Sequence, residues 1–500
     1  MASFTVSNLD LSLLVGTLVL LVAVAAARLS VRSGLPSLLL YLGIGVAIGE
    51  SGFGIDFRSA ELTQVLGYCA LVLILAEGGL TTSWEGIRES IAPAAVLSTL
   101  GVLVSVGVVG VAAHQVLRVP WTTALLVGAV LSSTDAAAVF SVLRRVPLPR
   151  RLTGLLEAES GFNDAPVVIL VLALAAQASP GGSDQGAWWQ LLLIAVAELA
   201  GGAAIGLLIG YAGGHLMRRI AFSSSGLFSV GVMSLTVLAY AAGAMAHASG
   251  FLAAYLSALL LGNMRLPHRA AVRGFAQALG WLAQIGLFVL LGLLASPSQL
   301  PEQIPKAIGI GLVLLLVARP LSILVSLTPF RVPWRDQAFL SWAGLRGGVP
   351  VVLATLPLTA GTPHMEWLFD LVFVLVAIFT LVQAPTLPWV ARTLGVTDSD
   401  RALDLEVEST PLDALGAEVL EMTVGDTSRL NGVEIMELRL PIGANVTLVV
   451  RNGEGFVPAS RTVLRHGDQL LIVATAKTRQ AAENRVRQIS KQGRLAGWSP

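Results

Sequence analysis

The chain has 500 residues, of which 55% are hydrophobic and only 13% are charged, and its formal net charge is +1 at pH 7. No ordinary soluble domain of this size has a mean hydropathy of +0.77. These values exclude a water-soluble enzyme and indicate a polytopic α-helical membrane protein whose first partner is the lipid bilayer. The balanced charge gives no reason to expect nucleic acid as a partner.

The metal-ligating residue types are sparse. Cys69 is the single cysteine, so the sequence offers no disulfide framework and no cysteine-based metal site. The six histidines show no metal-ligand spacing, and we find no convincing pair of nucleophile and base. We therefore expect no catalytic residues, no resident metal and no enzymatic activity.

Apolar runs of membrane-spanning length divide the first part of the chain, residues 1–394. Counting them predicts about thirteen transmembrane helices. They cover residues 9–27, 35–50, 62–82, 91–113, 121–143, 152–177, 188–211, 224–247, 249–263, 274–295, 304–327, 337–358 and 367–394.

The loops between these runs alternate in charge. One set holds nearly all of the arginines, including Arg150 and Arg151, whereas the cations of the other set are Arg58, Arg118 and Lys306. Since arginine and lysine concentrate in cytoplasmic loops, this bias places the N-terminus outside and the C-terminus in the cytoplasm.

Charged residues return at ordinary density after Leu394, which marks a change of domain. We expect a polar linker at 395–415, a small α+β cytoplasmic domain at 416–490 and a tail at 491–500. Alternating residues predict strands at 417–423, 443–451 and 469–474, followed by a short helix over 476–488.

Two acids and an amide interrupt the sixth apolar run. On a helix, residues four apart share a face, so Glu159 stacks on Asn163 and Ser160 on Asp164. Ionisable groups inside a membrane are costly, and they face a cavity or a partner rather than lipid. We interpret the group as an ion site, with a polar interhelical hydrogen-bond cluster as the alternative.

Two further runs contain residues that favour a break in the helix. Asp135 follows Ser132-Ser133-Thr134 in the fifth run, and Arg346 lies within the glycine-rich segment 344–350 of the twelfth. Interrupted helices in corresponding spans are typical of an inverted repeat, with the binding site where the half-helices meet. The alternative is close helix packing through small residues.

Arg319, in the eleventh run, carries a permanent charge and needs a buried acid as its partner. Our candidate is Glu159, which leaves Asp164 as the titratable carboxylate. A carboxylate that holds either a proton or a cation, but not both, exchanges one for the other by competition. Glu77 is either a further oxygen ligand or an interfacial acid that faces water.

Several motifs together resemble the NhaP-type branch of the monovalent cation:proton antiporters. They are Thr134-Asp135, Glu159-Ser160 with Asn163-Asp164, the segment 251–263 from Phe251-Leu252-Ala253-Ala254-Tyr255 to Gly262-Asn263, Arg319, and Gly344-Leu345-Arg346-Gly347. The resemblance implies an inverted-repeat antiporter fold with two crossed discontinuous helices, and a homodimer whose core domain moves against a dimerisation domain. We expect the protein to lie in a prokaryotic cytoplasmic membrane and to serve pH and cation homeostasis.

The resemblance also implies roles for individual residues. Asp164 would carry the cation and the proton, with Asn163 as its partner in place of a second acid. Thr134 through its backbone, Ser160 through its hydroxyl and Glu77 would complete the cation's ligands. Because relatives with two adjacent aspartates are electrogenic, the Asn-Asp pair implies electroneutral exchange. Ala136 departs from the proline that many relatives carry after the aspartate.

The C-terminal domain resembles the C-terminal lobe of the domains that regulate potassium conductance (TrkA-C or RCK-C). The resemblance rests on residues 440–444, 449–451 and 463–470, and no glycine-rich dinucleotide fingerprint precedes them. It implies that this domain regulates transport, with a small molecule such as a nucleotide as its ligand, and it implies no cofactor. It also favours K+ over Na+ as the transported ion. A Na+/H+ antiporter is the alternative. A potassium channel would need a filter such as Thr-Val-Gly-Tyr-Gly, which the chain lacks.

Overall fold

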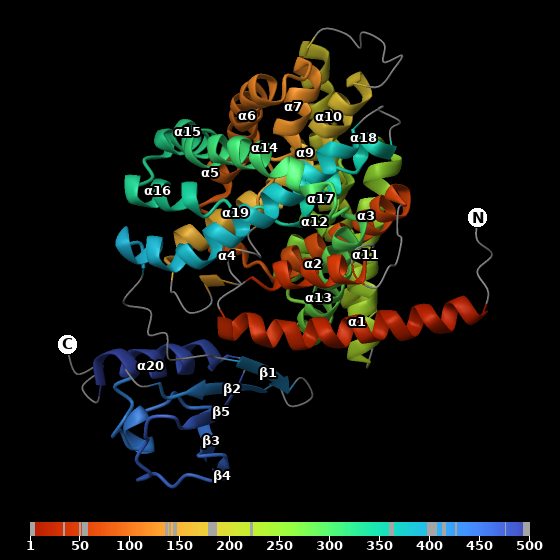
Figure 1. Ribbon diagram of the computed structural model, residues 1–500. Helices are drawn as coiled ribbons and strands as arrows, with labels where there is room; N and C mark the ends of the chain where they lie inside the picture. The colour runs from red at the N-terminus through yellow and green to blue at the C-terminus, as the bar shows by residue number, and fades with distance from the viewer. Residues whose placement is uncertain are drawn as a thin grey trace. The chain divides into compact units, whose positions relative to one another are not determined.

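The computed structural model describes residues 6–33, 36–49, 52, 59–135, 139, 142–143, 148–178, 188–220, 224–359, 365–397, 408–412, 417–425, 428–475 and 477–493. The chain forms two compact units, a helical unit that covers most of residues 1–396 and a second unit that consists mainly of the chain from Thr397 onward (Figure 1).

Every apolar run predicted as a span contains one or more helices of the first unit. Eight of the helices among the described residues are long and apolar enough to cross a membrane. The helices are α1 (Val6–Ser33), α2 (Ser37–Ile48), α3 (Ala60–Thr81), α4 (Trp84–Ile87), α5 (Ile91–Val96), α6 (Val102–Leu117), α7 (Trp121–Val130), α9 (Arg150–Ala178), α10 (Trp188–Arg219), α11 (Ser225–Met245), α12 (Gly250–Asn263), α13 (Arg269–Leu294), α14 (Leu300–Val313), α15 (Arg319–Leu327), α16 (Trp334–Trp342), α17 (Gly348–Leu353), α18 (Leu356–Thr359) and α19 (Glu366–Thr393).

Two helical segments of this unit are interrupted, and the interruptions meet. Helix α7 ends at Val130, and residues 133–135 are not helical. Helix α16 ends at Trp342, and the chain is again not helical until α17 begins at Gly348. The backbone N–H of Asp135 donates to the carbonyl oxygen of Leu345 at 2.9 Å. Both breaks lie where the sequence places its small residues, because such residues are poor helix formers.

Two π-helical turns form a second pair of irregular elements. One spans Leu97–Gly101 between α5 and α6, and the other spans Leu314–Ala318 between α14 and α15. The Ser322 hydroxyl donates to the carbonyl oxygen of Gly101 at 2.8 Å, which joins the segments that carry the two turns. Arg319 is the first residue after the second turn.

The C-terminal unit is a five-stranded antiparallel sheet with order β1-β2-β5-β3-β4. Its strands are β1 (Glu408–Leu412), β2 (Ala417–Thr423), β3 (Ala444–Arg451), β4 (Glu454–Phe456) and β5 (Gln469–Thr475). Helix α20 (Arg479–Gln492) contacts β2 and β5 and closes a core that includes Leu420, Ile472 and Val486 (Figure 1).

Two boundaries of this unit differ from those expected. The range expected as a polar linker, 395–415, contains β1, an edge strand that pairs with β2. Its Pro411 obscures the strand in the sequence, but an edge strand tolerates proline because one side of it needs no donors. Helix α20 extends to Gln492, so it enters the range expected as a tail.

Candidate cation site

Helix α9 presents its polar residues on two neighbouring strips. Glu159 and Asn163 face the Thr134 and Arg319 side chains, whereas Ser160 and Asp164 line a cavity. All of these positions except the half-buried Ser160 are buried, and Asp164 keeps only 7% of its surface exposed. The helical spacing therefore gives the two acids, five residues apart, different surroundings.

A bidentate ion pair neutralises the first acid. Arg319 Nη1 donates to Glu159 Oε1 at 2.5 Å, and Nη2 donates to Oε2 at 2.9 Å. Both side chains are at least 94% buried. The Ser98 hydroxyl donates to the backbone carbonyl oxygen of Glu159 at 3.2 Å, and this bond helps to hold the turn of α9 that carries Glu159 in place. With its charge opposed by a permanent cation, Glu159 is a poor candidate for the group that exchanges ions.

The Thr134 hydroxyl connects the first interruption to α9. It accepts a hydrogen bond from Asn163 Nδ2 at 2.6 Å and donates to Glu159 Oε1 at 3.3 Å. Asn163 Oδ1 is buried and has no hydrogen-bond partner among the described residues. Asn163 thus supports the loop through Thr134, and it is not among the residues that line the cavity.

Asp164 receives a hydrogen bond from the residue before Thr134. Ser133 Oγ donates to Asp164 Oδ1 at 2.7 Å, and Ser133 itself is fully buried. No arginine or lysine forms an ion pair with Asp164 among the described residues. Its negative charge is therefore met by a hydroxyl on one side and by the cavity on the other.

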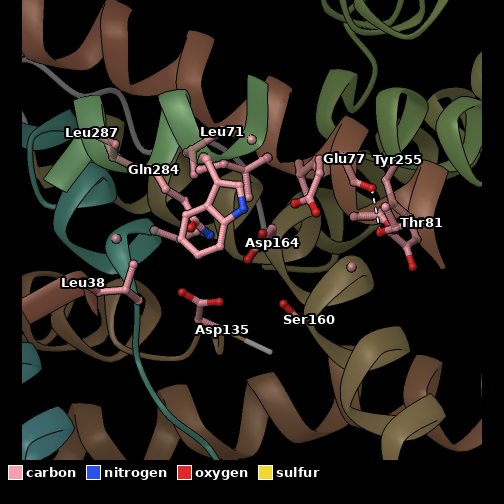
Figure 2. A pocket seen from close by; sticks show the side chains of 18 of the residues that line it. Leu38, Leu71, Glu77, Thr81, Asp135, Ser160, Asp164, Tyr255, Gln284 and Leu287 are labelled. Atoms are coloured by element: carbon pink, nitrogen blue, oxygen red, sulfur yellow. Dashed lines mark hydrogen bonds between the residues drawn. The ribbon is translucent and has the colours of Figure 1, made fainter. Parts of the chain in front are cut away.

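The cavity has a volume of about 470 Å³ and is lined by α2, α3, α9, α12, α13, the first interruption and the start of α17. Four carboxylate side chains line it, from Glu77, Asp135, Glu157 and Asp164. Figure 2 shows Glu77, Asp135, Ser160 and Asp164 pointing into the same space.

The acids are spread along this cavity. Among the described residues, no three His, Cys, Asp or Glu side chains converge closely enough to hold a metal ion. A cation at Asp164 would therefore be held by at most two carboxylates together with hydroxyl and carbonyl oxygens, such as those of Ser160 and Thr134, which also line the cavity.

Asp135 and Arg346 lie at the crossing of the interrupted helices. The Asp135 carboxylate lies against Gly347, just before α17 begins. Arg346 Nη1 donates to the Gly344 carbonyl oxygen at 3.0 Å, just after α16 ends. An acid near a helix start and a base near a helix end both oppose the helix dipole.

The structure thus brings Asp164, Ser160, Thr134 and Glu77 to one cavity, and it places Asn163 behind them. Sequence reasoning missed three residues of this region: Ser133, Glu157 and Tyr255. For Glu157 a signal existed, since it precedes Asp164 by seven residues, or about two helical turns, and so shares its face. Ser133 and Tyr255 lie in segments that the sequence analysis singled out, but no pattern indicated that either side chain reaches this site.

Comparison with known proteins agrees with this geometry. The family model "Sodium/hydrogen exchanger, transmembrane" matches residues 17–393, and the TrkA-C domain model matches residues 419–487. Among curated proteins, the chain is 36% identical over 477 residues to the K(+)/H(+) antiporter NhaP of Alkalimonas amylolytica, covering 93% of this chain and 81% of the relative.

Further relatives include both K(+)/H(+) and Na(+)/H(+) antiporters by name. The K(+)/H(+) antiporter NhaP2 of Shewanella oneidensis is 35% identical, with 94% of this chain and 82% of the relative covered. The Na(+)/H(+) antiporter NhaS2 of Synechocystis is 30% identical, with 78% and 71% covered.

Among solved structures, the sodium proton antiporter MjNhaP1 from Methanocaldococcus jannaschii shares the fold. The TM-score is 0.67 at 21% sequence identity, and the match covers 77% of this chain and 99% of the other. The match confirms the expected antiporter fold with its interrupted helices. From the extent of the family match and the identity to these relatives, the chain belongs to the sodium/hydrogen exchanger family of transmembrane proteins.

Proposed function

We propose that the protein is an electroneutral antiporter that exchanges a monovalent cation, K+ in preference to Na+, for H+, and that Asp164 carries both. One observation carries the proposal. Asp164 is a buried carboxylate that lines the cavity with a hydroxyl donor and no cationic partner among the described residues, whereas Arg319 neutralises the neighbouring Glu159. A proton and a cation compete for the same oxygens of Asp164, so binding one releases the other.

One cycle of this exchange moves no net charge across the membrane. Asn163 takes the place of a second acid beside Asp164, so a single carboxylate takes up either one proton or one monovalent cation. The membrane potential is worth about 2.3 kcal/mol per charge per 100 mV, and it has no charge to act on in such a cycle.

Two observations support K+ as the preferred ion. Relatives 36% and 35% identical are named K(+)/H(+) antiporters, and the TrkA-C match covers the C-terminal unit. Against this, a relative with 30% identity is named a Na(+)/H(+) antiporter, so exchange of Na+ for salt tolerance is the second candidate.

The setting of this activity is also part of the proposal. The bias of the arginines between alternate loops supports an N-terminus outside and a C-terminal unit in the cytoplasm of a prokaryotic cell. There the C-terminal unit would adjust transport, with a small molecule such as a nucleotide as its ligand. We propose a homodimer as the working form.

The test is transport in liposomes that contain the purified protein and a trapped pH dye. A pH gradient is imposed, K+ or Na+ is added, and the potential is clamped at zero or displaced. We expect K+ to dissipate the gradient at the same rate at both potentials, and Asp164→Asn to abolish exchange. Exchange that persists in Asp164→Asn overturns the assignment of the carrier. A dependence on potential overturns electroneutrality, and large unitary currents in planar bilayers overturn antiport.

A further inference from the structure

The cavity continues along α9 beyond Asp164. Glu157, Ser160, Gly161 and Asp164 all line it, and their spacing of three, four and seven residues places them on one face of the helix. At 1.5 Å per residue, the Glu157 backbone lies about 10 Å from that of Asp164, toward the end of α9 that begins at Arg150.

The Glu157 carboxylate, unlike those of Glu159 and Asp336, has no structural partner among the described residues. Glu159 pairs with Arg319, and Asp336 pairs with Arg151 at 2.8 Å. Among the described residues, Glu157 forms neither an ion pair nor a side-chain hydrogen bond. An acid that served only to hold helices together would be paired in the same way, so Glu157 is available to a ligand.

A second group points to the same part of the cavity. Tyr255, on α12, lines the cavity with only 3% of its surface exposed, and its buried hydroxyl makes no hydrogen bond of 3.5 Å or less among the described residues, although the Thr82 side chain lies close to it. Its ring packs against Gly161, where a methyl group would overlap it, and meets Phe162 edge-on at 5.9 Å. Buried hydroxyls without a partner are rare in folded proteins, and they indicate a missing ligand or water.

We propose that Glu157 and the Tyr255 hydroxyl form an outer cation position, through which a partly hydrated K+ or Na+ passes between Asp164 and the Arg150 end of α9. The carboxylate raises the local concentration of cations, and the hydroxyl oxygen replaces a water of the ion's hydration shell. This inference rests on the proposed cation exchange at Asp164, because the outer position at Glu157 has a role only if cations reach Asp164 through it.

The test compares full-length variants in liposomes, with the rate of proton movement measured against K+ concentration. For Glu157→Gln we expect the apparent KM for K+ to rise on the order of fivefold at low ionic strength, with kcat within about twofold of wild type. Because the attraction is electrostatic, the difference should shrink in about 0.5 M choline chloride. Glu157→Asp should keep a KM near that of wild type.

Tyr255→Phe tests the hydroxyl separately, since it keeps the ring against Gly161. We expect a higher KM with kcat retained. The matched control is Glu89→Gln, which removes the same charge from an exposed residue outside the cavity, and which should leave both constants unchanged.

The outcomes separate two failures. A Glu157→Gln protein whose KM matches wild type, or whose loss is entirely in kcat and equal at both ionic strengths, overturns the outer position. A wild-type protein that shows no cation-dependent proton movement overturns the proposed exchange itself, whatever the variants do.

Discussion

The backbone N–H of Asp135 donates to the carbonyl oxygen of Leu345 at 2.9 Å, so the two interrupted helices are joined by a main-chain bond at the point where they cross. The Asp135 side chain lies against Gly347 at the same point. The crossing is therefore a single packed unit, and a displacement of one interrupted helix carries the other with it.

Gly347→Ala should disrupt this crossing. A methyl group at position 347 would overlap the Asp135 carboxylate, and overpacking of a buried site costs about 1–3 kcal/mol. We expect loss of most transport and a lower Tm in detergent. Gly107→Ala is the control, because a methyl group there meets open space, and it should leave both quantities unchanged. Normal transport in Gly347→Ala would show that the crossing accommodates a side chain.

Breaking the Glu159–Arg319 pair should destabilise the helical unit. Arg319→Met leaves a buried carboxylate without its cation, which costs about 3–5 kcal/mol. The double variant Glu159→Gln/Arg319→Met removes both charges and should recover much of that loss in Tm. If the double variant is no more stable than Arg319→Met, the loss comes from packing of the long arginine side chain and not from the unpaired charge.

Thr134→Val should impair transport more than Thr134→Ser. Valine has nearly the shape of threonine but cannot accept the bond from Asn163 or donate to Glu159, whereas serine can do both. Leaving the buried Asn163 amide unsatisfied costs about 1–3 kcal/mol, whereas Glu159 keeps its hydrogen bonds from Arg319. Initial rates of K+-driven proton movement check the difference, and equal rates in the two variants would mean that the hydroxyl is not needed.

The C-terminal unit should lose stability in acid through Asp468. This carboxylate is fully buried and accepts bonds from Arg451 Nε and Nη2, both at 2.7 Å, and from the Arg465 backbone N–H at 2.8 Å. Burial alone would raise the pKa of Asp468, but these hydrogen bonds and the two arginine charges lower it below its usual 3.8.

Because the pKa of Asp468 is lower in the folded state than in the unfolded state, its contribution is complete at neutral pH and is lost as the pH falls through the folded value. Asp468→Asn should therefore cost about 1–3 kcal/mol at pH 7 and much less once the pH falls below the folded-state pKa of Asp468. Hydrogen exchange of residues 444–475 in the intact protein, compared between wild type and variant at each pH, measures this. If the difference in stability between wild type and variant stays constant with pH, the loss of stability comes from packing.

How far the sequence predicts this molecule depends on the kind of feature. Apolar length located the helices, and small residues located both interruptions, because these effects are local. The pairing of Arg319 with Glu159 was expected because a buried permanent charge needs an opposite one nearby. That Glu159 and Asp164 have different surroundings follows from helical spacing.

The remaining features depend on contacts that local patterns do not contain. Ser133 reaches Asp164 because of how the first interruption folds over α9, and Tyr255 reaches the cavity because Gly161 leaves room for its ring. The strand β1 forms only because β2 provides a partner, despite Pro411. The π-helical turns have no sequence signature of their own.

The π-helical turn at Leu314–Ala318 has a consequence for insertions and deletions. A turn of this type holds one residue more than an α-helical turn, so it shifts the phase of everything after it by about 100°. Arg319 follows immediately, and its direction toward Glu159 thus depends on that one additional residue. Shortening the segment by one residue would restore a regular helix and turn the guanidinium away from its carboxylate, so this stretch tolerates substitution of its apolar side chains better than any change in its length.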